Sequence, residues 1–106
     1  MTWLSRLSPL LRELRVQYPP GSPDAHGLRS FIQQNYEFMR RNNPHTAILL
    51  RTGQAARTRL VLVKAEGGQE LEIACTGLSE EQVAAALQDS LAKLERSGSA
   101  SRIAAS

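Results

Sequence analysis

In residues 11–27, LRELRVQYPPGSPDAHG, an alternation of apolar and polar residues ends and the entry to a helical pattern begins. Apolar and polar side chains alternate from Leu10 to Tyr18, which indicates a half-buried strand in which Arg12 is the exception on the apolar face. The double proline that follows ends the strand. Ser22 is a natural helix cap, and Pro23 suits a first helical turn. The stretch therefore predicts a strand followed directly by a helix.

Four more elements, a helix and three strands, follow from the patterns downstream. Between Ser22 and Asn43 an amphipathic helix is predicted, because apolar residues recur every three or four positions. These residues are Leu28, Phe31, Ile32, Tyr36 and Met39. Residues 46–51, TAILLR, form an apolar run expected of an inner strand covered on both faces. Residues 58–66 and 69–77 flank a Gly-Gly pair and predict a hairpin.

The last element begins at residues 79–82, SEEQ, where Ser79 and Gln82 can form a capping box. An apolar stripe of Val83, Leu87, Leu91 and Leu94 predicts a helix that packs on the sheet. After Lys93 the chain becomes small and polar, so we expect residues 96–106 to be a flexible tail.

The order β-α-β-β-β-α predicts an α/β fold with a four-stranded mixed sheet that two main helices can cover. The thioredoxin-like fold without its middle helix is favoured, and a split β-α-β sandwich of the ferredoxin type is the rival. The domain is expected over residues 10–95. Residues 1–9 form an N-terminal arm, either as part of a mitochondrial targeting segment or as an apolar arm that packs on this domain or on a neighbour.

Thiol-disulfide exchange is excluded by the residues at the predicted helix entry. Thioredoxin-like enzymes carry Cys-x-x-Cys there, whereas this chain reads PGSPDAHG at 20–27. Its one cysteine, Cys75, is expected to pack in the core; the alternative is a residual thiol enzyme that works through this residue. Neither His26 nor His45 lies in a pattern typical of catalysis or metal binding. No catalytic, cofactor or metal residue is predicted.

Positive charge is concentrated in one part of the chain. Residues 28–59 hold six arginines and the single acid Glu37, whereas the whole chain has a formal charge of +3. Five of the arginines are candidates for partner contact: Arg40, Arg41, Arg51, Arg57 and Arg59. Guanidinium groups pair with carboxylates or phosphates, so the partner is either an acidic protein or a phosphate backbone, unless the arginines simply form a solvated face. No phosphate-binding glycine loop and no exposed aromatic platform accompanies them.

The first half of the chain resembles the small thioredoxin-like accessory subunits of mitochondrial NADH:ubiquinone oxidoreductase, respiratory complex I, of the alpha subcomplex subunit 2 type. The matching residues, in the family's order and spacing, are Leu14-Arg15, Ser22-Pro23, Gly27, Phe31, Tyr36, Arg40-Arg41, Asn43-Pro44 and Leu50-Arg51. From residue 52 to 94 the resemblance continues as a pattern only. Animal members carry two cysteines at places that match the neighbourhoods of Pro19 and Gly53 here, so a redox role for such a pair does not transfer. The loop 52–58 also lacks the cis-proline of thioredoxins.

The resemblance implies a non-catalytic subunit of the matrix-side peripheral arm, near the NADH-oxidising module, that supports assembly or stability. It would contact the large iron-sulfur subunit and would itself hold no flavin, cluster or quinone. Its expected location is the mitochondrial inner membrane, peripheral and on the matrix side, without a membrane span. The family shares this domain with some mitochondrial ribosomal proteins, so the alternative is a ribosomal protein that binds rRNA through its arginines, although nucleic acid is the less favoured partner.

Overall fold

A computed structural model describes residues 2–54 and 56–105 of the chain, and the side chains of residues 3–54 and 56–95. Met1 and Ser106, the ends of the predicted arm and tail, lie outside the described residues. The main elements are β1 (Leu11–Tyr18), α1 (His26–Asn42), β2 (Ala47–Thr52), β3 (Arg59–Lys64), β4 (Glu70–Ala74) and α2 (Glu80–Ala105). Short 3-10 helices cover Thr2–Ser5 and Pro23–Ala25. This β-α-β-β-β-α order, with four strands and two main helices in the described part of the chain, confirms the predicted fold class.

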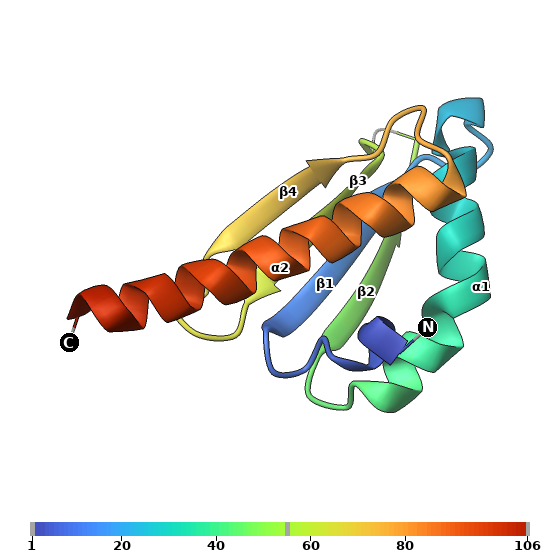
Figure 1. Ribbon diagram of the computed structural model, residues 1–106. Coiled ribbons are helices and arrows are strands. Elements are labelled where there is room, and N and C mark those ends of the chain that lie inside the picture. Colours follow the sequence, from blue (N-terminus) through green and yellow to red (C-terminus); the bar gives the residue numbers. More distant parts are fainter. Residues whose placement is uncertain (1, 55, 106) are drawn as a thin grey trace.

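The strands form one mixed sheet in the order β2-β1-β3-β4 (Figure 1). β1 is parallel to β2 and antiparallel to β3, and β3 is antiparallel to β4. The prediction that residues 46–51 form an inner strand was wrong, because β2 is an edge strand. The crossover through α1 places β2 on one side of β1, and β3 then occupies the other side. Four of the six residues of β2 are exposed.

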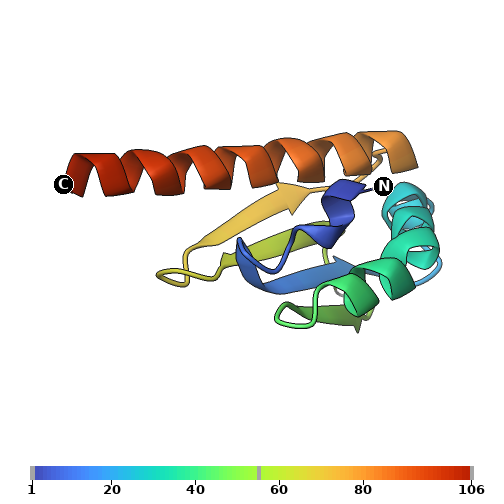
Figure 2. The same ribbon diagram turned by 60° about the horizontal axis from the view of Figure 1, so that its bottom comes forward.

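Both α-helices lie against the same face of the sheet, as Figures 1 and 2 show together. The apolar residues of that face form rows across the strands, such as Leu14 beside Leu62 and Val16 beside Leu60. The predicted stripe of α2 is buried there, and so are four of the five predicted residues of α1; the fifth, Tyr36, packs half-buried against the core. The opposite face of the sheet is therefore left without a helix.

A bulge explains why Arg12 interrupts the apolar face of β1. The pairing with β3 shifts between Leu11 and Glu13, so one residue of β1 has no partner on the neighbouring strand. Leu11 turns into the core, Leu10 is only half-buried, and Arg12 is exposed. The Arg12 guanidinium lies over the hairpin turn, where a methyl group on Gly68 would come within 2.9 Å of Nη2.

The start of α1 differs in detail from the prediction. Ser22 precedes the 3-10 helix Pro23–Ala25 and makes no side-chain capping bond, and α1 begins at His26. Gly27 is needed because the turn before α2 approaches α1 closely here: a Cβ atom built on it would lie 1.9 Å from the Leu78 carbonyl oxygen. Glu80, in the first turn of α2, accepts a hydrogen bond from Ser30 Oγ on α1 at 2.6 Å.

The capping box of α2 is confirmed. The Ser79 N–H donates to Gln82 Oε1 at 2.9 Å, and the Gln82 N–H donates to Ser79 Oγ at 3.1 Å. The helix continues to Ala105, well past the end expected near Lys93, because the i to i−4 hydrogen bonds of a helix can extend through small and polar residues without tertiary contacts. The flexibility of residues 96–106 stays a prediction.

The N-terminal arm is part of the folded domain. Leu4 and Leu7 are fully buried in the core, and the side chain of Asn43 joins the arm to the end of α1. Asn43 Oδ1 accepts from the N–H groups of Leu7 (2.9 Å) and Ser8 (3.2 Å). Its Nδ2 donates to the carbonyls of Leu4 and Met39, both at 2.7 Å. One amide thus satisfies four backbone groups from two separate segments.

Candidate partner-binding surface

The loop before α1 is held by packing and hydrogen bonding to the turn between β4 and α2. The N–H of Gly77 donates to the carbonyl of Asp24 at 2.8 Å, which ties the loop to the turn between β4 and α2. Ala25 and Gly27 are buried at this contact. The place where thioredoxin-like enzymes carry their thiols is therefore used here to join two segments of the chain.

The side chain of Cys75 is fully buried and belongs to the hydrophobic core. Burial is the main influence on its ionisation: desolvation raises the pKa of the thiol to about 11, against a smaller lowering effect of a backbone hydrogen bond from Leu60. A thiol of this kind is almost entirely protonated at neutral pH, and the thiolate is the nucleophilic form. The placement agrees with the predicted packing role.

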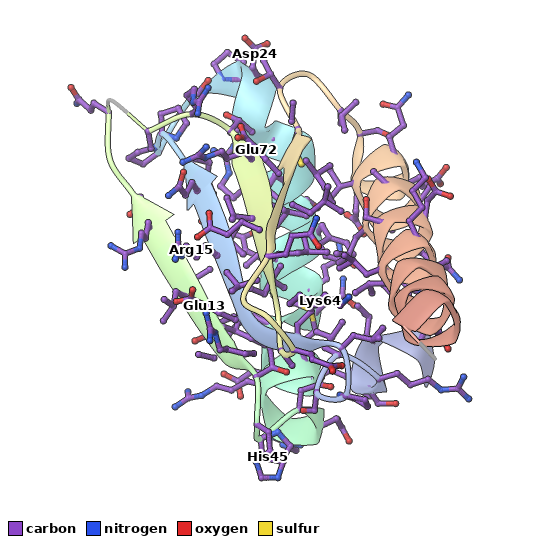
Figure 3. All side chains as sticks on the ribbon, turned by 90° about the vertical axis from the view of Figure 1, so that its left-hand side faces the viewer. Glu13, Arg15, Asp24, His45, Lys64 and Glu72 are labelled. Atoms are coloured by element: carbon purple, nitrogen blue, oxygen red, sulfur yellow. The ribbon has the colours of Figure 1, made fainter. Side chains whose placement is uncertain are left out.

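Both histidines are exposed, His26 at the start of α1 and His45 in the turn before β2. Figure 3 shows His45 at one end of the molecule, far from Asp24 at the other. Across the described residues, no three His, Cys, Asp or Glu side chains gather in an arrangement able to hold a metal ion.

The five candidate arginines are divided between two ends of the sheet. Arg40 and Arg41 lie in the last turn of α1, at the end where β2 begins. Arg51 lies near the opposite end of β2, in register with Gln17, which is also in register with Arg59. The prediction of one arginine cluster is therefore refined to two groups.

The arginines also differ in how far they are neutralised. Arg59 contacts Glu72 at 2.9 Å and donates to Gln17 Oε1, and Arg57 lies 3.6 Å from the same Glu72 carboxylate. The remaining three, Arg40, Arg41 and Arg51, are exposed and have no ion-pair partner among the described side chains. Of the five candidates, these three are the ones that remain available to a partner.

The helix-free face of the sheet carries a second charged group, whose residues were not among the predicted contact residues. Arg15 lies 3.0 Å from Glu13 and 3.6 Å from Glu70, so it connects β1 to the far edge strand β4. Figure 3 looks onto this face, and Glu13, Arg15 and Glu72 are labelled on it. The polar half of the β1 alternation was the available signal for this face.

These ion pairs cover the apolar residues beneath them. Val61 and Val63 point toward the helix-free face, yet they are only 3% and 1% exposed. Their neighbours across the strands are the charged residues Arg15, Glu13, Glu70 and Glu72, whose aliphatic stems can lie over the valines. The ion pairs therefore shield the centre of this face, whereas the edge strand β2 has four exposed residues.

A shallow groove of about 180 Å³ lies between the N-terminal arm and α2. It is lined by Trp3, Arg6, Leu10, Gln88, Leu91, Ala92 and Glu95. Nothing in its lining resembles a catalytic pair or a set of cofactor ligands. None of the described helices combines the length and hydrophobicity that crossing a lipid bilayer requires.

Comparison with known proteins gives relatives that cover most of the chain. NADH dehydrogenase (ubiquinone) 1 alpha subcomplex subunit 2 of Mus musculus is 33% identical over 81 residues, which cover 76% of this chain and 81% of that protein. The protein of the same name from Arabidopsis thaliana is 28% identical over 89 residues, covering 84% of this chain and 91% of its own length. The NADH-ubiquinone oxidoreductase 10.5 kDa subunit of Neurospora crassa is 32% identical over 73 residues, covering 69% and 77%. No protein-family model matches the chain. On the strength of the mouse relative, the chain belongs to the family of NADH dehydrogenase (ubiquinone) alpha subcomplex subunit 2.

Proposed function

We propose that the chain is a non-catalytic accessory subunit of mitochondrial respiratory complex I. The observation that carries this proposal is the 33% identity to the mouse subunit over 81% of that protein's length. The similar match to a fungal subunit, 32% identical over 77% of its length, supports the same assignment from a second lineage.

The absence of a catalytic role is supported by chemistry. A thiol enzyme of this fold needs an exposed, acidic thiol at the start of α1, and the residues there are prolines, Ser22 and Asp24. The thiol that the chain does have is buried at Cys75, with its pKa raised to about 11. Its work in the complex is therefore structural: it supports assembly or stability.

The proposed location is the inner membrane, on the matrix side, in the peripheral arm near the NADH-oxidising module. Other complex I subunits are the proposed partners, with the large iron-sulfur subunit first among them. An import signal in residues 1–12 would have to stay attached, because Leu4 and Leu7 belong to the core and their removal would open a large cavity.

Complexome profiling of mitochondria from cells that make the protein tests the proposal. We expect the chain to comigrate with the large respiratory assembly, and the yield of that assembly to fall when the chain is depleted and to recover when it is restored. Comigration with ribosomal subunits would refute the proposal and favour the rRNA-binding alternative. In that case binding should also weaken steeply as salt is raised, since phosphate contacts release counterions.

A further inference from the structure

β2 has the composition of an inner strand but the position of an edge strand. Its first four residues, Ala47 to Leu50, are apolar, and Leu50 is 43% exposed. Edge strands are usually protected by charges, prolines or bulges, because an open edge can pair with other chains. The other edge strand, β4, follows this rule with Glu70 and Glu72. β2 carries no such device before Arg51.

The outer side of β2 offers backbone groups in a known pattern. The N–H of Gly53 points to β1, where it donates to the Tyr18 carbonyl at 3.4 Å. Because the direction alternates along a strand, the N–H and C=O groups of Thr52, Leu50 and Ile48 point away from β1. No strand of the described residues pairs on that side. β2 forms the left-hand border of the sheet in Figure 3.

Unneutralised positive charge lies at both ends of this edge. Arg51 is the fifth residue of β2, and Arg40 and Arg41 lie in the last turn of α1, which leads into the turn 43–46 before β2. All three are exposed and lack an ion-pair partner among the described side chains. An added strand with carboxylates at its ends would meet complementary charge at both.

A second copy of the chain fits this edge less well. Two β2 strands paired antiparallel would place the beginning of one, with its Arg40 and Arg41, beside the Arg51 end of the other. Like charges would then gather at both ends of the joined strands, which opposes association. The charge therefore favours a different, acidic partner.

We propose that the outer edge of β2 accepts an extended, acidic segment of another protein, which adds to the sheet as a further strand. Main-chain hydrogen bonds to Ile48, Leu50 and Thr52 would hold the segment, and Leu50 would contact an apolar side chain on it. The inference rests on the proposed function, in that the segment belongs to another subunit of the respiratory assembly.

The test replaces the protein in cells by full-length variants and measures the fraction that comigrates with the respiratory assembly. Thr52→Pro removes an outward N–H without removing a hydrogen bond to β1, and Leu50→Lys places a charge on the edge. Phe38→Lys is the matched control, because Phe38 is 41% exposed but lies on α1. We expect the comigrating fraction to fall by at least about tenfold for both edge variants and to stay unchanged for the control.

The outcomes separate the two proposals. Failure of the wild-type chain to comigrate would refute the proposed function, and the inference with it. Comigration of the wild type and of both edge variants alike would overturn the inference and leave the function intact. Arg51→Glu should weaken association more in low salt than in high salt, whereas a salt-independent effect would contradict the charge argument.

Two measurements without destabilising substitutions guard against variants that fail to fold. Amide exchange of Leu50 should slow by about tenfold or more between the free chain and the assembly, whereas the inward amide of Leu49 should be protected in both. Unchanged exchange at Leu50 would overturn the inference. A photo-crosslinking group at position 50 should capture an acidic segment of another subunit, and capture of a second copy or of RNA would equally overturn it.

Discussion

Replacing Asn43 by alanine is expected to be among the most destabilising single changes to a polar residue of this chain. The Asn43 side chain is 1% exposed and satisfies four backbone groups, three of them in buried hydrogen bonds. Each backbone group left buried without a partner costs about 1 to 3 kcal/mol. Water can reach the half-buried Ser8 N–H, and the Met39 carbonyl lies at a helix end, so we count the full cost only for Leu7 and Leu4.

The resulting loss in the free energy of unfolding is about 4 kcal/mol, within a range of about 2 to 6 kcal/mol. A domain of this size has about 5 to 15 kcal/mol in total, and the loss should lower Tm by about 15 to 30 °C. Urea and thermal unfolding of the full-length chain, followed by circular dichroism, measure both quantities. The urea m-value should stay the same, so that the change in midpoint reports stability alone.

Asn42→Ala is the matched control for this prediction. Asn42 precedes Asn43 directly and also donates from Nδ2 to a backbone carbonyl, that of Phe38 at 2.9 Å, but it is exposed. Its replacement should change the free energy of unfolding by no more than about 0.5 kcal/mol. If Asn43→Ala cost less than about 1 kcal/mol, or no more than the control, the four hydrogen bonds would not hold the arm as described.

Three further predictions concern other parts of the chain. Gly27→Ala should lower the free energy of unfolding by about 3 kcal/mol because its methyl group meets the Leu78 carbonyl, whereas Gly53→Ala, with open space around it, should be near neutral in urea unfolding. The buried thiol of Cys75 has a pKa raised from 9.0 to about 11, so its contribution to stability is fully present below pH 9 and is lost as pH rises toward 11. Unfolding of wild type and Cys75→Ala at pH 7 to 11 should show this difference in slope, and native-state alkylation should be slow. Hydrogen exchange should be fast at residues 96–105 and slow at residues 83–94, and equal protection of both would refute the flexible tail.

Periodicity was sufficient to predict every main element of this fold. The alternation in β1, the three-to-four spacing in α1 and the capping box at Ser79 each involve neighbours within one turn or one strand, so they can be read from the sequence directly. The bulge at Arg12 appeared as a break in the pattern. Its meaning depended on the pairing with β3, some 50 residues away.

The features that were missed depend on distant partners. The apolar composition of β2 predicted burial, but its place at the edge follows from which later strand pairs with β1. The pair Asn42-Asn43 before a proline looks like an ordinary helix end, and its role is visible only once Leu4 and Leu7 return to it. The arginines are close in the sequence but separated in space, because β2 carries the chain from one end of the sheet to the other between the two groups.

The position of β1 has a consequence for how the molecule is made. β1 is the first strand of the chain to emerge, during synthesis or import, yet it lies between β2 and β3. Its two edges therefore stay unpaired until residues 47–52 and 59–64 follow. Until Lys64 is available, neither inner strand of the sheet has a neighbour on both sides, and one edge of β1 stays unpaired. Such long-range pairing slows folding and exposes strand edges to aggregation. The chain should therefore depend on chaperones at least until residue 64 has emerged, and the apolar face of the sheet stays open until the buried residues of α2 follow.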